Sequence, residues 1–130
     1  MNETIVILDS DPIMSAVLQE ALDSAGYLAI STHDLGAAVE RLNEVEPDLL
    51  IVRPYINSMP GSMAADYLRT KHPGLPVLVV SGFMDDDRVN VQNTIRNFHV
   101  FPKSFEREEF VANIKSVLEC ESKKNDAGTR

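Results

Sequence analysis

The sequence is short of cysteine and of long apolar runs, and both shortages narrow its class. Cys120 is the single cysteine, so no disulfide can form within the chain, and no metal-ligand spacing surrounds it. No apolar run approaches the ~20 residues of a membrane-spanning helix. Residues 1–8 lack the basic start and cleavage site of a signal peptide. We therefore expect a cytoplasmic protein that makes no membrane contact.

Basic residues are scarce relative to acidic ones. The 130 residues include 12 Lys and Arg against 20 Asp and Glu, which gives a formal net charge of -8 at pH 7. Nucleic-acid phosphates are bound largely through Lys and Arg contacts. We therefore expect no direct binding of nucleic acid by this chain.

The composition that remains is that of one globular domain. Hydrophobic residues are 44% of the chain and charged residues 25%, both ordinary values, and the length suffices for one core. We assign residues 1–120 to this domain. Residues 121–130, ESKKNDAGTR, are polar and have no apolar stripe, so they are predicted to be a disordered tail.

Short apolar runs alternate with helical patterns along the domain. Five runs rich in β-branched residues read as strands: TIVIL (4–8), YLAIS (27–31), DLLIV (48–52), PVLVV (76–80) and FHVF (98–101). Between or after them, apolar residues recur at three- and four-residue steps within 13–25, 39–45, 64–68 and 110–118. Residues 85–97 have the poorest stripe, and we expect that helix to be the most mobile.

This alternation predicts an α/β fold with one doubly wound parallel sheet. Each strand-to-strand connection is a right-handed crossover, so helices cover both faces of the five-stranded sheet. Strands covered on both sides are expected to be buried on both faces. Functional groups of such folds collect at the carboxyl ends of the strands. No Gly-rich phosphate loop of the GxxxxGK type is present, which argues against a nucleotide-binding enzyme of this fold.

Four strand ends carry polar residues: LDSDP (8–12), VRPYINSMPG (52–61), VSGF (80–83) and FPKSF (101–105). With GY after the first helix, PDLLIV at the third strand and PVLVVSG at the fourth, the chain resembles the receiver domain of two-component response regulators. The resemblance covers about residues 3–119. It implies the flavodoxin-like topology with strand order 2-1-3-4-5.

The resemblance also implies a phosphorylation site. In that family, two adjacent acids after the first strand hold Mg²⁺, and an Asp ending the third strand accepts a phosphoryl group. A Ser or Thr and a Lys then contact the phosphoryl oxygens. Position by position, Asp9 matches the first acid, Ser10 falls on the second, Arg53 falls on the acceptor, Ser81 matches the hydroxyl and Lys103 the lysine.

Two of these five positions depart from the family pattern. A guanidinium is always protonated and is no nucleophile, so Arg53 cannot accept a phosphoryl group. Ser10 and Arg53 also remove two oxygen ligands that a hard dication prefers, and Arg53 would repel it. We expect no Mg²⁺ and no other cofactor. Arg53 is instead predicted to pair with the carboxylate of Asp9 or of Asp11.

Each site residue also has a plainer structural interpretation. Arg53 could extend its cation from the strand end to water. Asp9 and Asp11 could cap the following helix, and for Asp11 we favour that role. Ser81 could belong to a simple turn, and Lys103 could be a solvated loop charge.

We therefore predict a degenerate receiver that is not an enzyme and acts as a phosphorylation-independent protein interaction module. The partner would be a sensor kinase, an effector domain or a second copy of the chain in a homodimer. The family commonly docks through its fourth helix, fifth strand and fifth helix, which here offer Arg88, Val91, Ile95, Phe98, Phe101 and Lys115. Two alternatives stay open: a phosphorelay receiver with a different acceptor, and a domain that senses an anion or small molecule through Arg53 and Lys103.

Overall fold

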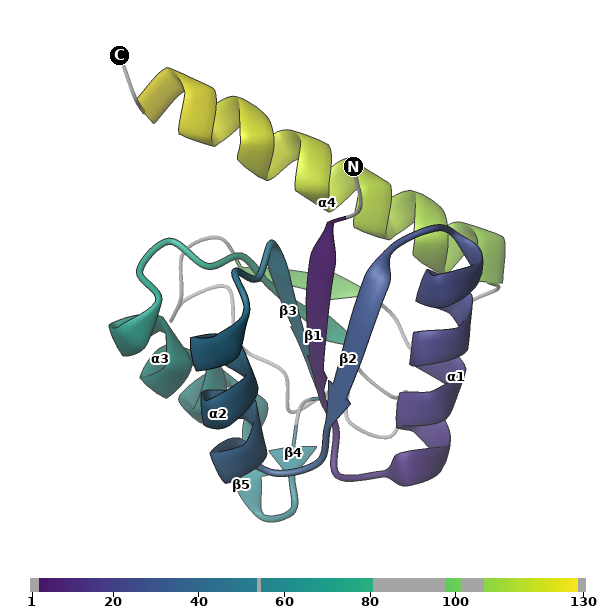
Figure 1. Ribbon diagram of the computed structural model, residues 1–130, viewed down its shortest axis with the longest axis vertical. Helices are drawn as coiled ribbons and strands as arrows, with labels where there is room; N and C mark the ends of the chain where they lie inside the picture. Colours follow the sequence, from purple (N-terminus) through teal and green to yellow (C-terminus); the bar gives the residue numbers. More distant parts are fainter. Residues whose placement is uncertain (1–2, 54, 81–97, 102–106, 129–130) are drawn as a thin grey trace.

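The computed structural model of the chain describes residues 3–53, 55–80, 98–101 and 107–128. The elements in chain order (Figure 1) are β1 (Thr4–Leu8), α1 (Pro12–Ser24), β2 (Leu28–Thr32), α2 (Leu35–Glu44), β3 (Leu49–Val52), β4 (Tyr55–Ile56), β5 (Met59–Pro60), α3 (Gly61–Lys71), β6 (Val77–Val80), β7 (Phe98–Phe101) and α4 (Arg107–Gly128).

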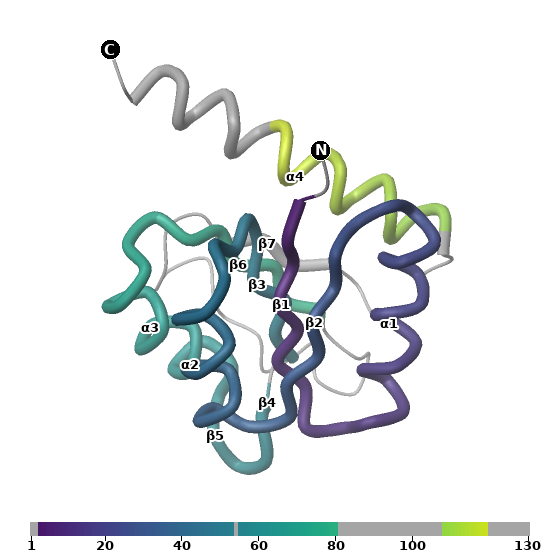
Figure 2. The backbone as a smooth tube through the Cα atoms, viewed as in Figure 1, coloured from purple at the N-terminus to yellow at the C-terminus, as the bar shows by residue number. Residues whose placement is uncertain are grey.

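Five of these strands form one parallel sheet in the order β2-β1-β3-β6-β7. Since β6 and β7 are its fourth and fifth strands along the chain, the described residues confirm the predicted order. Figure 1 shows α1 on one side of the sheet and α2 with α3 on the other, and Figure 2 shows β1 between β2 and β3. The doubly wound α/β prediction is therefore confirmed.

The core is divided into two clusters by the sheet. In β1, Ile5 and Ile7 pack on the side of α1 and α4, while Val6 and Leu8 pack on the side of α2 and α3. Side chains alternate between the two faces of a strand. Every residue of β3 and β6 is buried as well, which explains why these strands read as continuous apolar runs.

The edge strand β2 departs from the prediction of burial on both faces. Leu28 is 52% exposed, and only Ala29 and Thr32 of this strand are fully buried. The outermost strand has a neighbour on one side only, so its flanking helices cover it incompletely. Gln19 of α1 covers part of it: its Nε2 donates to the Ala29 carbonyl at 3.2 Å and its Oε1 accepts from Ser31 Oγ at 2.8 Å.

The C-terminal helix corrects the predicted disordered tail. The helix α4 continues to Gly128, so residues 121–128 are helical and the boundary expected at residue 120 falls inside the helix. The segment contains no proline and no glycine before Gly128, and its Glu, Lys and Ala residues have high helix propensity. A helix does not need an apolar stripe along its whole length, because propensity can extend a helix that packing has already fixed.

A short hairpin of β4 and β5 was not predicted from the sequence. Asn57 at its turn has φ 57, a left-handed conformation that Asn tolerates better than most residues. Two-residue strands are too short to show periodicity. The predicted helix at 85–97 lies outside the described residues. Within those residues, no helix is long and apolar enough to span a bilayer.

Candidate functional site

The carboxyl ends of β1, β3 and β6 bring the main candidate residues together. Leu8 pairs with Val52, and Val52 pairs with Val79. The next residues along the chain are Asp9 after Leu8, Arg53 after Val52 and Val80 after Val79. These three residues therefore occupy one row across the ends of three adjacent strands.

Asp9 is buried directly after β1 and is held there by hydrogen bonds. Its side chain is 2% exposed, its backbone N–H donates to the Thr32 carbonyl at 3.0 Å, and its Oδ1 accepts from the Asp11 N–H at 2.9 Å. Its Oδ2 is buried and has no hydrogen-bond partner among the described residues. A buried oxygen of this kind is costly unless a charge compensates it.

Arg53 supplies that charge. Its Nε lies 3.7 Å from Asp9 Oδ2, and its side chain is 18% exposed. The distance exceeds that of a hydrogen bond, so the contact is an electrostatic ion pair. The Nη1 atom donates to the Val80 carbonyl at 2.9 Å. The predicted pairing with Asp9 is thus confirmed, and the guanidinium does not simply extend to water.

Asp11 and Ser10 have local structural roles. Asp11 caps α1, because its Oδ1 accepts from the Ile13 N–H at 3.0 Å and from the Met14 N–H at 3.5 Å. The favoured interpretation of Asp11 as a helix cap is confirmed. Ser10 Oγ accepts from the Asn57 N–H at 3.3 Å, and this contact connects the end of β1 to the hairpin.

The electrostatic balance at Asp9 is set first by its burial. Burial raises the pKa of the Asp9 carboxyl above its usual value, while the Asp11 N–H and the Arg53 cation act to lower that pKa. Smaller effects come from the Asp11 carboxylate, which raises the pKa, and from His33, which lowers it. The Arg53 cation therefore compensates only part of the desolvation cost of a charged Asp9.

The described residues do not fit the Mg²⁺ that the family pattern implies. Mg²⁺ prefers an octahedral set of oxygen ligands, whereas Asp9 offers a single buried oxygen with a guanidinium 3.7 Å away. The Asp11 carboxylate caps a helix instead. In the part of the chain that the structure describes, no group of three or more His, Cys, Asp or Glu could hold a metal.

Several predicted site residues lie outside the described residues: Ser81, Lys103, Arg88, Val91 and Ile95. Of the predicted partner face, Phe98 and Phe101 lie in β7, paired with Val77 and Val80. Lys115 lies exposed on α4.

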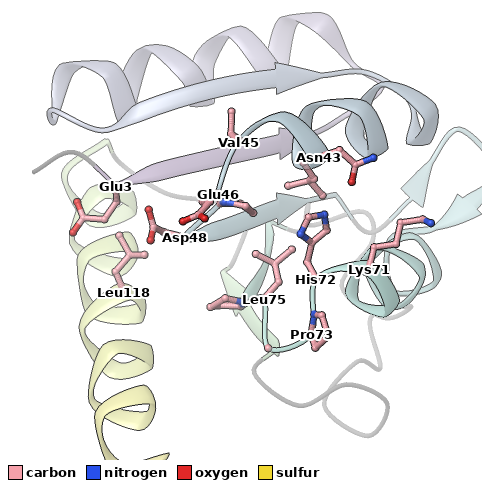
Figure 3. A pocket seen from close by; sticks show the side chains of 14 residues that line it. Glu3, Asn43, Val45, Glu46, Asp48, Lys71, His72, Pro73, Leu75 and Leu118 are labelled. Carbon is pink, nitrogen blue, oxygen red and sulfur yellow. The ribbon is translucent and has the colours of Figure 1, made fainter. Parts of the chain in front are cut away.

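A hollow at the amino-terminal edge of the sheet was not predicted from the sequence. It encloses about 710 Å³. Figure 3 shows Glu3, Glu46 and Asp48 gathered at one end of it, with His72 and Leu75 further along. The His72 Nε2 is buried and makes no hydrogen bond to the described part of the chain. These residues come from separate connections and form no motif, so the sequence held no signal for this hollow.

The sheet order and the helices on both faces define a flavodoxin-like α/β domain. The family model described as "Response regulator receiver domain" matches residues 5–115. The chain belongs to this family, whose members are signalling modules of two-component systems.

Relatives known by sequence agree with this membership. The chain is 30% identical over 113 residues to the DNA-binding transcriptional regulator NtrC of Escherichia coli, which covers 86% of this chain and 24% of that protein. It is 25% identical over 116 residues to the probable transcriptional regulatory protein TcrX of Mycobacterium tuberculosis, covering 88% and 49%. The chain thus spans about a quarter to a half of these relatives.

The fold is also close to solved structures of low sequence identity. Brucella abortus NtrX in complex with ADP superimposes with a TM-score of 0.87 at 20% identity, covering 98% of this chain and 30% of that one. Vibrio cholerae chemotaxis protein CheY4 superimposes with a TM-score of 0.80 at 15% identity, covering 90% and 99%. At these identities the similarity concerns the fold alone.

Proposed function

We propose that this receiver domain signals without being phosphorylated, as a protein interaction module. The observation that carries the proposal is Arg53 at the end of β3, where the family places its acceptor Asp. Its guanidinium cannot attack a phosphoryl donor, and it is already engaged with Val80 and Asp9. Ser10, a hydroxyl that follows β1, accepts from the Asn57 N–H, and among the described residues no hydrogen bond joins it to a base.

The same residues give no support to catalysis or to metal-dependent chemistry. Asp9 Oδ2 faces the Arg53 cation, Asp9 Oδ1 accepts from the Asp11 N–H, and Asp11 Oδ1 caps α1. We therefore propose that the domain is not an enzyme and works without Mg²⁺.

The partner we propose is a protein: a sensor kinase, an effector domain or a second copy of this chain. The face predicted for it comprises Arg88, Val91, Ile95, Phe98, Phe101 and Lys115. The net charge of -8 supports protein contact over direct nucleic-acid contact. A cytoplasmic location is proposed because curated relatives are transcriptional regulators.

Incubation with acetyl phosphate and Mg²⁺ tests the proposal, with intact-mass spectrometry as the readout. We expect the wild-type mass to stay unchanged. The matched control is the double variant Ser10→Asp/Arg53→Asp, which restores both missing carboxylates and should gain the mass of one phosphoryl group. Single Arg53→Asp, which lacks the second metal acid, should be labelled less.

The alternative of a phosphorelay receiver with a different acceptor predicts the opposite result for the wild type. Covalent phosphate on any wild-type residue would overturn the proposed function, and fragmentation of the labelled protein would identify that residue.

A further inference from the structure

We propose that Arg53 acts as an internal cation that ties the ends of β1, β3 and β6 together in place of a metal, so that the geometry of this edge does not depend on Mg²⁺. The inference rests on the proposed function only in taking the site to be free of a phosphoryl group. The inference goes beyond the proposed function by giving a physical reason for a fixed conformation: the Arg53 side chain contacts Asp9 at the end of β1 and Val80 at the end of β6.

The sheet register explains why one residue can reach both neighbours. Pairing of Leu8 with Val52 and of Val52 with Val79 places Asp9, Arg53 and Val80 in the next row. Arg53 starts from the middle strand, so a carboxylate lies on one side of it and a backbone carbonyl on the other. The donors of a guanidinium point in different directions within one plane. Its Nε faces Asp9 while its Nη1 faces Val80.

Because Asp9 and Arg53 are largely buried, loss of their contact should reduce stability. Asp9 Oδ2 receives no hydrogen bond from the described residues, so the Arg53 cation is the opposite charge that faces it at 3.7 Å. Removing one partner of a buried pair leaves the other uncompensated. Arg41 provides a contrast, because it pairs with Glu44 at 3.0 Å while the two side chains are 46% and 62% exposed. Exposed pairs of that kind contribute little.

The hydrogen bond from Arg53 to Val80 fixes the end of β6. Val80 is the last residue of β6, so a hydrogen bond to its carbonyl fixes the point from which the chain leaves the sheet. In a metal-dependent site, an added cation could move this edge between two arrangements. Here the cation belongs to the residue that directly follows β3, and the edge keeps one arrangement whether or not Mg²⁺ is present.

Thermal unfolding with and without MgCl₂ at matched ionic strength tests the tie, together with the ¹³C carbonyl resonance of Val80. We expect the wild-type Tm to be the same in both buffers. Arg53→Met should lower the Tm by roughly 5–10 °C, whereas Arg41→Met should lower it by less than about 2 °C. The Val80 carbonyl resonance should move in Arg53→Met and stay in place in Arg41→Met.

Arg53→Lys serves as the second variant, and it keeps the test decisive if Arg53→Met fails to fold. It retains the charge beside Asp9 but has no fork to reach Val80 as well, so it should lose part of the Tm and shift the Val80 resonance.

The tie is refuted if Mg²⁺ raises the wild-type Tm, if Arg53→Met is no more damaging than Arg41→Met, or if the Val80 resonance is unmoved. If the wild type is labelled with phosphate but the tie is intact, the proposed function is wrong and this inference stands. If the wild type is never labelled but the tie is absent, this inference is wrong and the proposed function stands.

Discussion

At the scale of single residues, Asp9 is a buried carboxylate whose Oδ2 accepts no hydrogen bond from the described residues. It is nearly free of solvent contact, one oxygen accepts from Asp11, and the other depends on the charge of Arg53. Its pKa is raised, chiefly by burial. A group with a raised pKa takes up a proton in the folded state at a pH where the unfolded chain has lost it.

The sign of the resulting pH dependence follows directly. Between the usual carboxyl pKa of 3.8 and the raised pKa of Asp9, the folded state binds more protons than the unfolded state. The free energy of unfolding contributed by Asp9 therefore rises as pH falls through the raised pKa, and it is lost as pH rises above it. Asp9→Asn removes this contribution.

Urea denaturation of the wild type and Asp9→Asn from pH 7 toward pH 4 measures the effect. The difference in the free energy of unfolding between them should change in favour of the wild type as the pH falls. Glu44→Gln, which alters an exposed carboxylate, is the control and should show a much smaller change. Parallel curves for the wild type and Asp9→Asn would contradict the raised pKa.

The site was predictable in part. Arg53 stood out because a cation ends an apolar strand, and Asp11 because it precedes Pro12 at a helix start. The second acceptor of Arg53 could not be predicted, since it is the backbone carbonyl of Val80. A carbonyl has no sequence signature, and its place beside Arg53 depends on the register of two strands.

At the scale of elements, α1 depends on its cap. Pro12 begins the helix and the Asp11 side chain accepts from two of the first backbone N–H groups. Asp11→Ala should lower the free energy of unfolding by about 1 kcal/mol, because those N–H groups then lose their side-chain acceptor. The midpoint of urea denaturation is the measurement.

Two comparisons make the cap prediction specific. Asp11→Asn keeps an oxygen acceptor and should retain most of the stability. Asp34→Ala removes the cap of α2, where the Ala37 N–H is bonded at 2.7 Å, and should cost a similar amount. If Asp11→Asn loses as much stability as Asp11→Ala, the effect comes from the charge of Asp11 and not from its hydrogen bonds.

Elements with strong periodicity were predicted closely, and those without it were not. The strand at 4–8 was predicted at its observed bounds, and the next three lie within one residue of theirs. The hairpin of β4 and β5 and the last turns of α4 have no apolar pattern, so they were missed.

At the scale of the whole molecule, the sheet separates two cores and two edges. One cluster joins α1 and α4 to the sheet, and the other joins α2 and α3. The carboxyl edge carries the row of Asp9, Arg53 and Val80, while the hollow of about 710 Å³ lies at the amino edge. Ligand or partner effects at the two edges can therefore be examined separately by mutation.

The Gln19 contact with β2 bears on how the molecule avoids aggregation. The Leu28 N–H donates to the Glu3 carbonyl, and the Thr32 carbonyl accepts from the Asp9 N–H. The backbone groups of these residues of β2 therefore point toward β1. Ala29 lies between them and must direct its N–H and carbonyl to the open side of the sheet. An open strand edge is a template for another strand, and the Gln19 amide occupies the Ala29 carbonyl there.

Gln19→Ala should therefore speed self-association through β2 while changing the urea midpoint only slightly. Light scattering of concentrated protein over time would show the difference, with the exposed Ser24→Ala on the same helix as the control. Equal aggregation rates in the two variants would mean that Gln19 does not guard the edge. Faster association of Gln19→Ala than of Ser24→Ala would show that a side chain which reads in the sequence as an ordinary polar helix residue keeps an open sheet from growing by one more strand.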